Sequence, residues 1–317
     1  MTYAQYGLIQ AADYNTLVGT NPNTTSGTLN TVWSTGGSLT GYGQTAEATV
    51  AAGDSVTAAK WANLITKTAN SASHQGTSLA TVTTPVAGGS VAYQGNIPTN
   101  LTTIYTSRLN AATQGATTAN AVTYGSSWLN ALTFTQTVTF ANGDAARYFF
   151  NSGGQLKIVC THAATSGAGN TLFNNLVANV GTVVMSAPTS GTITVASTSY
   201  NGITKIGGGA GGGNTISTNS GYYAMTTSNA NVFTQVAGTG GAYVNTFIRI
   251  IAKSNGTVGS NGDVGNVITL YTVWDEVPDG LTVGSGSTVT LTAVAPETTN
   301  LANTWGTISL SGSVSGS

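Results

Sequence analysis

The stretch LTFTQTVTFANGDAARYFFNSGGQLKIVC, from Leu132 to Cys160, predicts the fold of the larger part of this chain. Its first residues alternate apolar side chains with Thr and Gln, which is the period of a strand with one buried face. ANGD then indicates a turn, and ARYFFN and QLKIVC follow as two further apolar runs. Between them, SGG can adopt the positive φ angles that a short hairpin loop requires. We therefore expect a β-hairpin with Phe149, Gly153 and Gly154 as structural anchors.

Strand patterns continue toward the C-terminal end of the sequence, separated by turn residues at short intervals. One helical pattern, NTLFNNLVANVG, interrupts them and predicts a crossover helix near residues 170–181. We expect an α+β, mainly β chain, in which an antiparallel β-sandwich-like domain over residues 126–317 follows a short N-terminal helical segment.

The N-terminal part contains an internal echo. IQAADYNTL (Ile9 to Leu17) and VTAAKWANL (Val56 to Leu64) share one pattern of aliphatic, Ala-Ala, aromatic and Leu positions. In each copy the aromatic residue and the Leu are three apart, on one face of a helix. We expect a pseudo-repeat of two short helices over residues 1–72, packed through four anchors, Tyr14, Leu17, Trp61 and Leu64. Residues 73–125 are expected to form a connector with one helix over 98–113.

The chain has very few charges. Only 5% of its 317 residues are Asp, Glu, Lys or Arg, against about 25% in ordinary globular proteins. The net charge of −1 argues against binding to nucleic acid or to an anionic membrane surface, since both need clustered basic residues. No apolar run is long enough for a membrane span. Because little charge keeps copies apart, the composition favours a homo-oligomer or a subunit of an assembly.

Cys160 is the single cysteine, so an intrachain disulfide is excluded. It lies in the apolar row of its predicted strand, which indicates a buried and inert thiol. The first residues, MTYAQYGLIQ, lack the basic and continuous apolar regions of a signal peptide. We therefore expect a protein that is made in a cytoplasm and does not use the general secretory route.

Few residues offer chemistry. His74 and His162 have no further ligands at metal-binding spacing, so we expect ordinary polar roles for both. Asp275, Glu276 and Asp279 form the densest acidic group and could supply oxygen ligands to Ca²⁺. The alternative is a solvated turn at Pro278-Asp279-Gly280. We expect no catalytic centre and no cofactor, because no acid–base pair, triad or nucleotide-binding motif can be assembled.

Several segments together resemble a group of virion structural proteins of tailed bacteriophages of the marine and cyanobacterial type. They are LIQAADYNTL, GYGQTAEATVAAGDSVTAAKWANL, ARYFFNSGGQLKI and NTLFNNLVANVGTV, within residues 7–185. GYGQ together with YFFNSGG is the most specific part. The resemblance implies a structural protein of the virion, assembled in the host cytoplasm, with other virion proteins as partners. It supplies no catalytic residues.

Within that class the sequence leaves several roles open. The first is a tail or neck appendage, or a fibre-like subunit, that docks through its N-terminal region and forms a trimer by analogy with fibre-like phage proteins. The second is a head-decorating protein or an adhesin that binds a host-surface glycan. A polysaccharide-degrading enzyme is the last alternative, and it would need a cleft lined by paired carboxylates.

Overall fold

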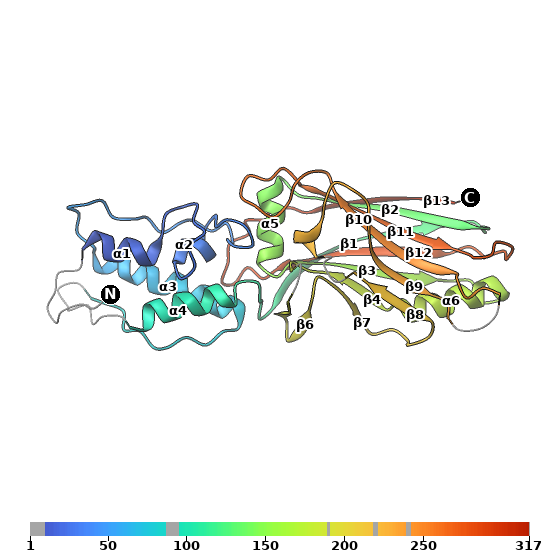
Figure 1. The fold of residues 1–317 in the computed structure, drawn as a ribbon, viewed down its shortest axis with the longest axis horizontal. Helices are drawn as coiled ribbons and strands as arrows, with labels where there is room; N and C mark the ends of the chain where they lie inside the picture. Colours follow the sequence, from blue (N-terminus) through green and yellow to red (C-terminus); the bar gives the residue numbers. More distant parts are fainter. Residues whose placement is uncertain (1–9, 87–94, 189–190, 218–220, 239–241, 317) are drawn as a thin grey trace.

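The computed structural model describes residues 10–86, 95–188, 191–217, 221–238 and 242–316. Helices form one end of an elongated molecule and a β-sandwich forms the rest (Figure 1). The expected mainly β class with an antiparallel sandwich is confirmed. The first helix, α1 (Ala11–Val18), and the end of the last strand, β13 (Ser309–Gly316), lie near opposite ends of the long axis.

Among the described residues, α1 packs with three more helices, α2 (Leu29–Val32), α3 (Ala58–Gln75) and α4 (Asn96–Thr106). The Thr57 hydroxyl accepts a hydrogen bond from the backbone N–H of Lys60 at the start of α3. Gly76 ends α3 in the left-handed conformation, with φ of +70°. The core of this helical domain contains Tyr14, Val18, Leu29, Val32, Tyr42, Trp61, Leu64, Leu101 and Ile104. No described helix combines the length and the apolar character needed to cross a bilayer.

The sandwich consists of two antiparallel sheets. The five-stranded sheet has the order β1 (Gln114–Tyr124), β12 (Ser287–Pro296), β3 (Gln155–His162), β4 (Thr182–Met185) and β7 (Ile203–Ile206). The six-stranded sheet has the order β13, β2 (Ala131–Thr139), β11 (Val267–Asp275), β10 (Phe247–Ser254), β9 (Ala230–Val236) and β8 (Gly213–Ile216). A further pair joins β5 (Ile193–Val195) and β6 (Thr198–Tyr200).

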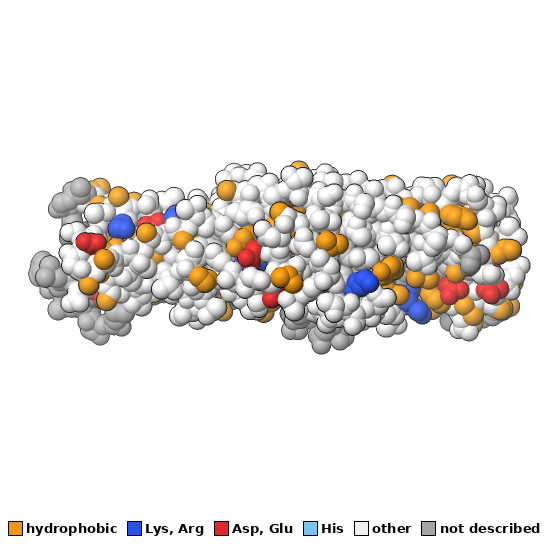
Figure 2. Space-filling model, turned by 90° about the horizontal axis from the view of Figure 1, so that it is seen from above, with side chains coloured by type: hydrophobic (Ala, Val, Ile, Leu, Met, Phe, Trp, Pro, Cys, Tyr) orange, Lys and Arg blue, Asp and Glu red, His pale blue; other side chains and the backbone are white. Residues whose placement is uncertain are grey.

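Period-two burial is clear in the six-stranded sheet. In β2, Leu132, Phe134 and Val138 are buried, while the intervening threonines are half-exposed. Gln136 shares the buried row, and its Nε2 donates across the sandwich to the carbonyl oxygens of Asn120 and Val289. The outward row leaves a neutral, hydroxyl-rich face. From above, most of the molecular surface is neither charged nor apolar (Figure 2).

The edge strands β1 and β13 meet along one side of the sandwich. A side chain at Gly312 would place its Cβ 2.6 Å from the Val122 side chain, so only glycine permits this approach. At the end of β13, a Cβ at Gly316 would lie 3.0 Å from the Tyr124 hydroxyl. The two sheets therefore close against each other at this side, and β13 is not an isolated edge.

The predicted hairpin over Arg147–Cys160 is wrong in its first half. Residues Gly143–Asn151 form a helix, α5, and only the second half, β3, is a strand. Asn142 caps α5, since its Oδ1 accepts a hydrogen bond from the Ala145 N–H at 2.8 Å. Gly153 has the expected positive φ, +82°, but it leads the chain out of a helix and not around a hairpin.

The crossover helix is present as α6 (Ala168–Val180), two residues longer at its start than predicted. Its Phe173 ring stacks on Trp274 of the six-stranded sheet, with ring centroids 5.7 Å apart, and also meets Trp128 edge-on. Phe173, Leu176 and Val180 are fully buried. α6 therefore closes the sandwich core between the two sheets.

The domain limits differ from those expected. The helix predicted within the connector is α4, and α3 continues to Gln75, past residue 72. β1 lies inside the predicted connector and pairs with β12, so the sandwich begins at Gln114, before residue 126. The two helices of the pseudo-repeat also differ in length, since α1 has 8 residues and α3 has 18.

Candidate functional site

The segments GYGQ and RYFFNSGG, about 100 residues apart in the sequence, lie against each other at the boundary between the two domains. The loop of residues 36–44 leaves the helical domain and packs on α5 of the sandwich. A third segment, residues 297–305 between β12 and β13, returns to the same boundary. These three segments are named the interdomain joint here.

Arg147 is the centre of the joint. Its side chain is fully buried, and Nη1 donates to the carbonyl oxygens of Gly37 at 2.9 Å and Thr40 at 2.6 Å. Nη2 and Nε both donate to Asp144 Oδ1, at 2.7 and 3.1 Å. The guanidinium charge is thus compensated within α5, and its remaining donors hold the loop of the other domain.

Asn151, one turn further along α5, completes this contact. Its Nδ2 donates to the carbonyl oxygens of Thr40 at 2.9 Å and Gly41 at 3.0 Å. Its Oδ1 accepts a hydrogen bond from the Tyr223 hydroxyl. Since buried polar groups are costly when unpaired, Asn151 favours only an arrangement in which the two domains are docked.

Two glycines of the loop are required by the geometry. Gly41 has φ of +93°, and an added Cβ would lie 2.2 Å from the Thr35 carbonyl oxygen. Gly43 has φ of +72°, and its Cβ would lie 2.4 Å from the Tyr148 ring of α5. Any other residue at these positions would combine backbone strain with a steric clash.

Tyr42 lies between these glycines and points into the helical domain. It is fully buried, and its hydroxyl donates to the Arg108 carbonyl oxygen at 2.7 Å and accepts from Gln75 Nε2 at 2.8 Å. Burial raises the pKa of Tyr42 well above its ordinary value, so the phenol stays neutral. Its own carbonyl oxygen accepts from Thr304 Oγ1 at 2.6 Å.

The segment of residues 297–305 ties the sandwich back to the helices. Leu301 is 1% exposed and belongs to the core of the helical domain. Gln44 pairs with the Ala302 backbone in both directions, since Nε2 donates to its carbonyl oxygen and Oε1 accepts from its N–H, each at 2.9 Å. The sandwich thus contributes a core residue to the helical domain.

A buried hydrogen bond between two side chains adds to this connection. His74 of α3 and Glu297 lie 3.0 Å apart, between Nδ1 and Oε1, and both are nearly inaccessible to solvent. Because an ionised carboxylate can only accept hydrogen bonds, Nδ1 is the donor. The hydrogen bond from His74 lowers the pKa of Glu297 to about 2, opposed by burial and helped by N–H groups of Asn300 and Thr299. Glu297 is therefore ionised over the physiological range.

The polar contacts of the joint hold the two domains in one relative position. Arg147 pairs with Asp144, and His74 hydrogen bonds to Glu297. Asn151 and Gln44 donate to backbone carbonyl oxygens across the boundary between the two domains. The sequence signal that could have identified Arg147 is a cation within the apolar run AARYFF, in a chain with 8 Lys and Arg residues.

The predicted N-terminal anchors lie together. Tyr14 and Trp61 are buried, and their rings meet edge-on with centroids 5.4 Å apart. The Tyr14 hydroxyl donates to Glu47 Oε1 at 3.1 Å, and Glu47 also pairs with Lys67. Leu64 is fully buried and Leu17 is partly buried in the same core. In the sandwich, Phe149 is buried, and Gly154 lies so close that its Cβ would be 2.6 Å from the Phe149 carbonyl oxygen.

The calcium candidate is not supported. Among the residues that the structure describes, no three His, Cys, Asp or Glu side chains form a group that could hold a metal ion. Glu276 is 1% exposed, and its two carboxylate oxygens both accept from the Leu281 N–H, at 2.8 and 3.1 Å. Asp279 lies on the exposed turn at 278–280. Glu276 therefore stabilises the turn. This arrangement fits the alternative prediction of a turn at Pro278-Asp279-Gly280 better than a calcium site.

A hydrogen-bonded cluster around His162 was not predicted from the sequence. His162 Nδ1 lies 3.1 Å from Ser287 Oγ, and His162 Nε2 lies 2.9 Å from Asn170 Oδ1. The combination of Ser287, His162 and Asn170 resembles a hydrolase triad. However, Ser287 is fully buried, and its Oγ accepts a hydrogen bond from Trp128 Nε1. The three side chains therefore join β3, β12 and α6. Cys160 nearby is also buried, and burial raises its pKa to about 12, which keeps the thiol protonated.

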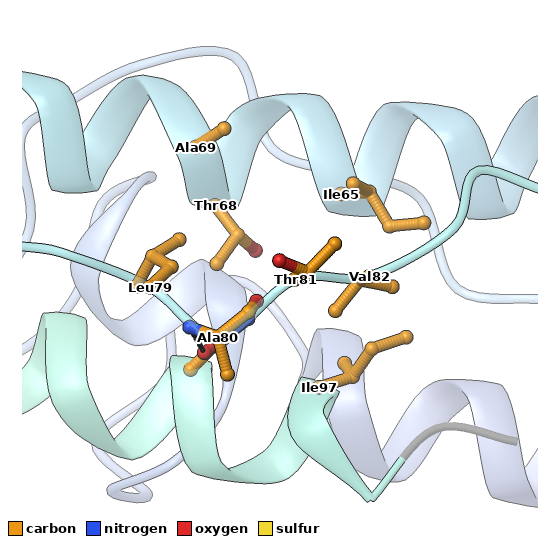
Figure 3. Close-up of a pocket in the computed structure, with 9 residues that line it drawn as sticks. Ile65, Thr68, Ala69, Leu79, Ala80, Thr81, Val82 and Ile97 are labelled. Carbon is orange, nitrogen blue, oxygen red and sulfur yellow. Dashed lines mark hydrogen bonds between the residues drawn. The ribbon is translucent and has the colours of Figure 1, made fainter.

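The helical domain contains an apolar cavity of about 290 Å³ between α3, α4 and an extended segment (Figure 3). Asn100 fixes that segment, because its Oδ1 accepts from the Ala80 N–H and its Nδ2 donates to the Ala80 carbonyl oxygen. The lining residues are Ile65, Thr68, Ala69, Leu79, Ala80, Thr81, Val82, Ile97 and Asn100. Because none of these described lining residues has a titratable side chain, the cavity suits an apolar group.

No protein-family model, curated protein or solved structure matches this chain.

Proposed function

We propose that this chain is a structural component of a tailed-phage virion, as a tail or neck appendage or a fibre-like subunit that docks through its helical domain. The observation that carries the proposal is the interdomain joint. Its two main segments, GYGQ and RYFFNSGG, are the motifs on which the resemblance to virion structural proteins rests most strongly.

A fixed joint suits an appendage. A subunit that is held at one end and presents a surface at the other must keep the angle between its two domains. Here the contact is made by a buried guanidinium, a buried amide and two glycines without space for a Cβ. Such contacts lose their hydrogen-bond partners when the domains separate, so they favour one orientation.

The surface supports assembly with copies of the same chain. The outward rows of β2 and β13 consist mainly of Thr and Ser, and Thr137 and Ser311 hydrogen bond to each other at 2.6 Å. When an interface covers a hydroxyl group, the free energy cost of removing its water is smaller than the cost for a charged group. We propose a homo-oligomer, with a trimer as the first expectation, whose stability depends weakly on salt because few ion pairs are available.

Immunogold electron microscopy tests the proposal. Antibodies raised against the recombinant chain should label purified phage particles at the tail or neck. Label over the capsid would favour the head-decorating alternative, and label at distal fibre ends would favour the adhesin. Absence of the chain from purified particles, checked by mass spectrometry, would overturn a virion role. Light scattering at low and high salt then reports the oligomeric state.

A further inference from the structure

A second cavity lies at the end of the sandwich that is remote from the helical domain. It has a volume of about 310 Å³ and is lined by Tyr124, Ser127, Trp128, Leu129, Thr282 and Gly316. Gly316 is at the end of β13, at the opposite end of the long axis from α1 (Figure 1). None of these lining residues belongs to the interdomain joint.

Hydrogen bonds of Trp128 and Asn130 fix the loop of residues 127–130 on the sandwich. Trp128 is 4% exposed, its Nε1 donates to Ser287 Oγ at 3.1 Å, and its backbone forms two hydrogen bonds with Val283. The next residue, Leu129, is 47% exposed, which is unusual for a large apolar side chain in this chain. Asn130 follows with φ of +61°, and its carbonyl oxygen accepts from the Glu276 N–H. Leu129 is therefore held at the surface by the backbone hydrogen bonds of Trp128 and Asn130 on either side of it.

Hydroxyl groups surround this apolar surface. Tyr124, Ser127 and Thr282 each contribute one, and within the described part of the chain none of the three hydrogen bonds to another protein group. Because Gly316 has no side chain, the space next to the Tyr124 hydroxyl stays open. A small apolar surface with a few free polar groups is the usual lining of a ligand pocket.

The lining of the cavity disfavours anions. Among the described residues its lining has no charged side chain, so a bound carboxylate or phosphate would lose its hydration without a compensating charge there. A cation would likewise find no carboxylate in the lining.

From these features we infer that the cavity binds one ring of a neutral saccharide. A sugar ring has apolar C–H faces, which can pack on Tyr124 and Leu129, and hydroxyl groups, which can pair with Ser127 and Thr282. The preformed loop reduces the ordering cost, and so few contacts correspond to a millimolar Kd. The inference does not rest on the proposed virion role, because it concerns the isolated chain.

Saturation-transfer NMR on the full recombinant chain tests this inference. The probes are D-glucose, D-galactose, D-mannose and N-acetyl-D-glucosamine, with D-glucuronate as the charged comparison. The pocket variants are Tyr124→Ala and Thr282→Val, and Thr282→Val keeps the shape of an exposed side chain while removing its hydroxyl. Thr118→Val, on the exposed part of β1, is the matched control. Circular dichroism checks that each variant is folded.

We expect at least one neutral sugar to receive saturation from the wild-type chain and from Thr118→Val, with a weaker signal for D-glucuronate. Thr282→Val should weaken binding about fivefold, the effect of losing one hydrogen bond. Tyr124→Ala should abolish it. Failure of all four neutral sugars to bind would overturn the inference, as would equal binding of D-glucuronate, or binding that neither pocket variant changes. Immunogold labelling of particles is unaffected by any of these outcomes.

Discussion

Arg147 Nη1 lies 2.6 Å from the Thr40 carbonyl oxygen, and this hydrogen bond joins two domains across 107 residues of sequence. The donor is a fully buried guanidinium and the acceptor is a backbone atom of a glycine-flanked loop. Because Asp144 already compensates the charge, the bond to Thr40 acts mainly on the relative position of the domains.

Replacement of Arg147 by alanine should therefore destabilise the protein strongly. It leaves the buried Gly37 carbonyl oxygen without this donor and removes one of the two donors to the Thr40 carbonyl oxygen, and each lost buried hydrogen-bond partner costs roughly 1–3 kcal/mol. Urea unfolding measures the change. Arg249→Ala, at a half-exposed arginine on β10 that packs over Phe247, is the control and should cost less than about 1 kcal/mol. Equal effects of the two substitutions would contradict the role of Arg147.

Gly43→Ala should be more destabilising than Gly53→Ala. Both glycines have positive φ, +72° and +92°, so alanine suffers similar backbone strain of about 1–2 kcal/mol at each. Only at Gly43 would the new Cβ meet another side chain, the Tyr148 ring, which adds roughly 1–3 kcal/mol of overpacking.

The double variant Gly43→Ala with Tyr148→Ala separates these two effects. If the clash is the cause, the cost of Gly43→Ala should fall to that of Gly53→Ala when the ring is absent. Additive effects of the two substitutions would show instead that the loop does not press on α5.

The hydrogen bond between His74 and Glu297 predicts acid sensitivity. The folded protein lowers the pKa of Glu297 from an ordinary value near 4.5 to about 2. The associated stability is fully present above about pH 4.5 and is lost as the pH falls through about 2. It amounts to about 3 kcal/mol. The free energy of unfolding of the wild type should approach that of Glu297→Gln over this range, and a constant difference would contradict the prediction. The raised pKa of Glu276 cancels in the comparison.

Trp61→Ala should cost roughly 3–5 kcal/mol, since it leaves a cavity next to Tyr14 and Leu64 in the helical core. Trp61→Phe retains most of the contact and should cost much less. Thermal and urea unfolding of both variants check the prediction. A change below about 1 kcal/mol for Trp61→Ala would show that the Tyr14–Trp61 contact is not an anchor.

The sheets and long helices could be predicted from the sequence because their burial follows a simple period. Alternation in β2 and β11 has one buried and one half-exposed row, and α3 shows its aromatic and Leu residues three apart. These patterns depend only on neighbours in the sequence and on one covered face.

The error at α5 has a physical cause. Phe149 and Phe150 are adjacent and both buried, as are Arg147 and Asn151, because α5 is covered by the sandwich on one side and by the loop of the helical domain on the other. Only Asp144 and Tyr148 of the nine residues are partly exposed, so the sequence shows a short apolar run that periodicity alone does not distinguish from a buried strand. The positive φ of Gly153 is compatible with a hairpin loop and with the end of a helix. The capping residue Asn142 is the sequence feature that favours a helix here.

The joint itself could not be predicted from the sequence. Its acceptors are carbonyl oxygens of Gly37, Thr40 and Gly41, which leave no trace in the residue types. GYGQ and RYFFNSGG were recognisable as motifs, but nothing in their spacing indicates that they touch. Contacts between such distant segments depend on how the whole chain folds back on itself.

The most direct test of the central claim, that the joint fixes the two domains as one body, is a distance distribution between spin labels on either side of it. Thr99→Cys on α4 and Thr117→Cys on β1 are exposed labelling sites, while the native Cys160 is buried with its pKa raised to about 12 and should stay unlabelled. Pulsed electron–electron resonance should give one narrow distance peak, which broadens when Arg147→Ala and Asn151→Ala are added. A broad or multiple distribution in the chain with an intact joint would contradict the account.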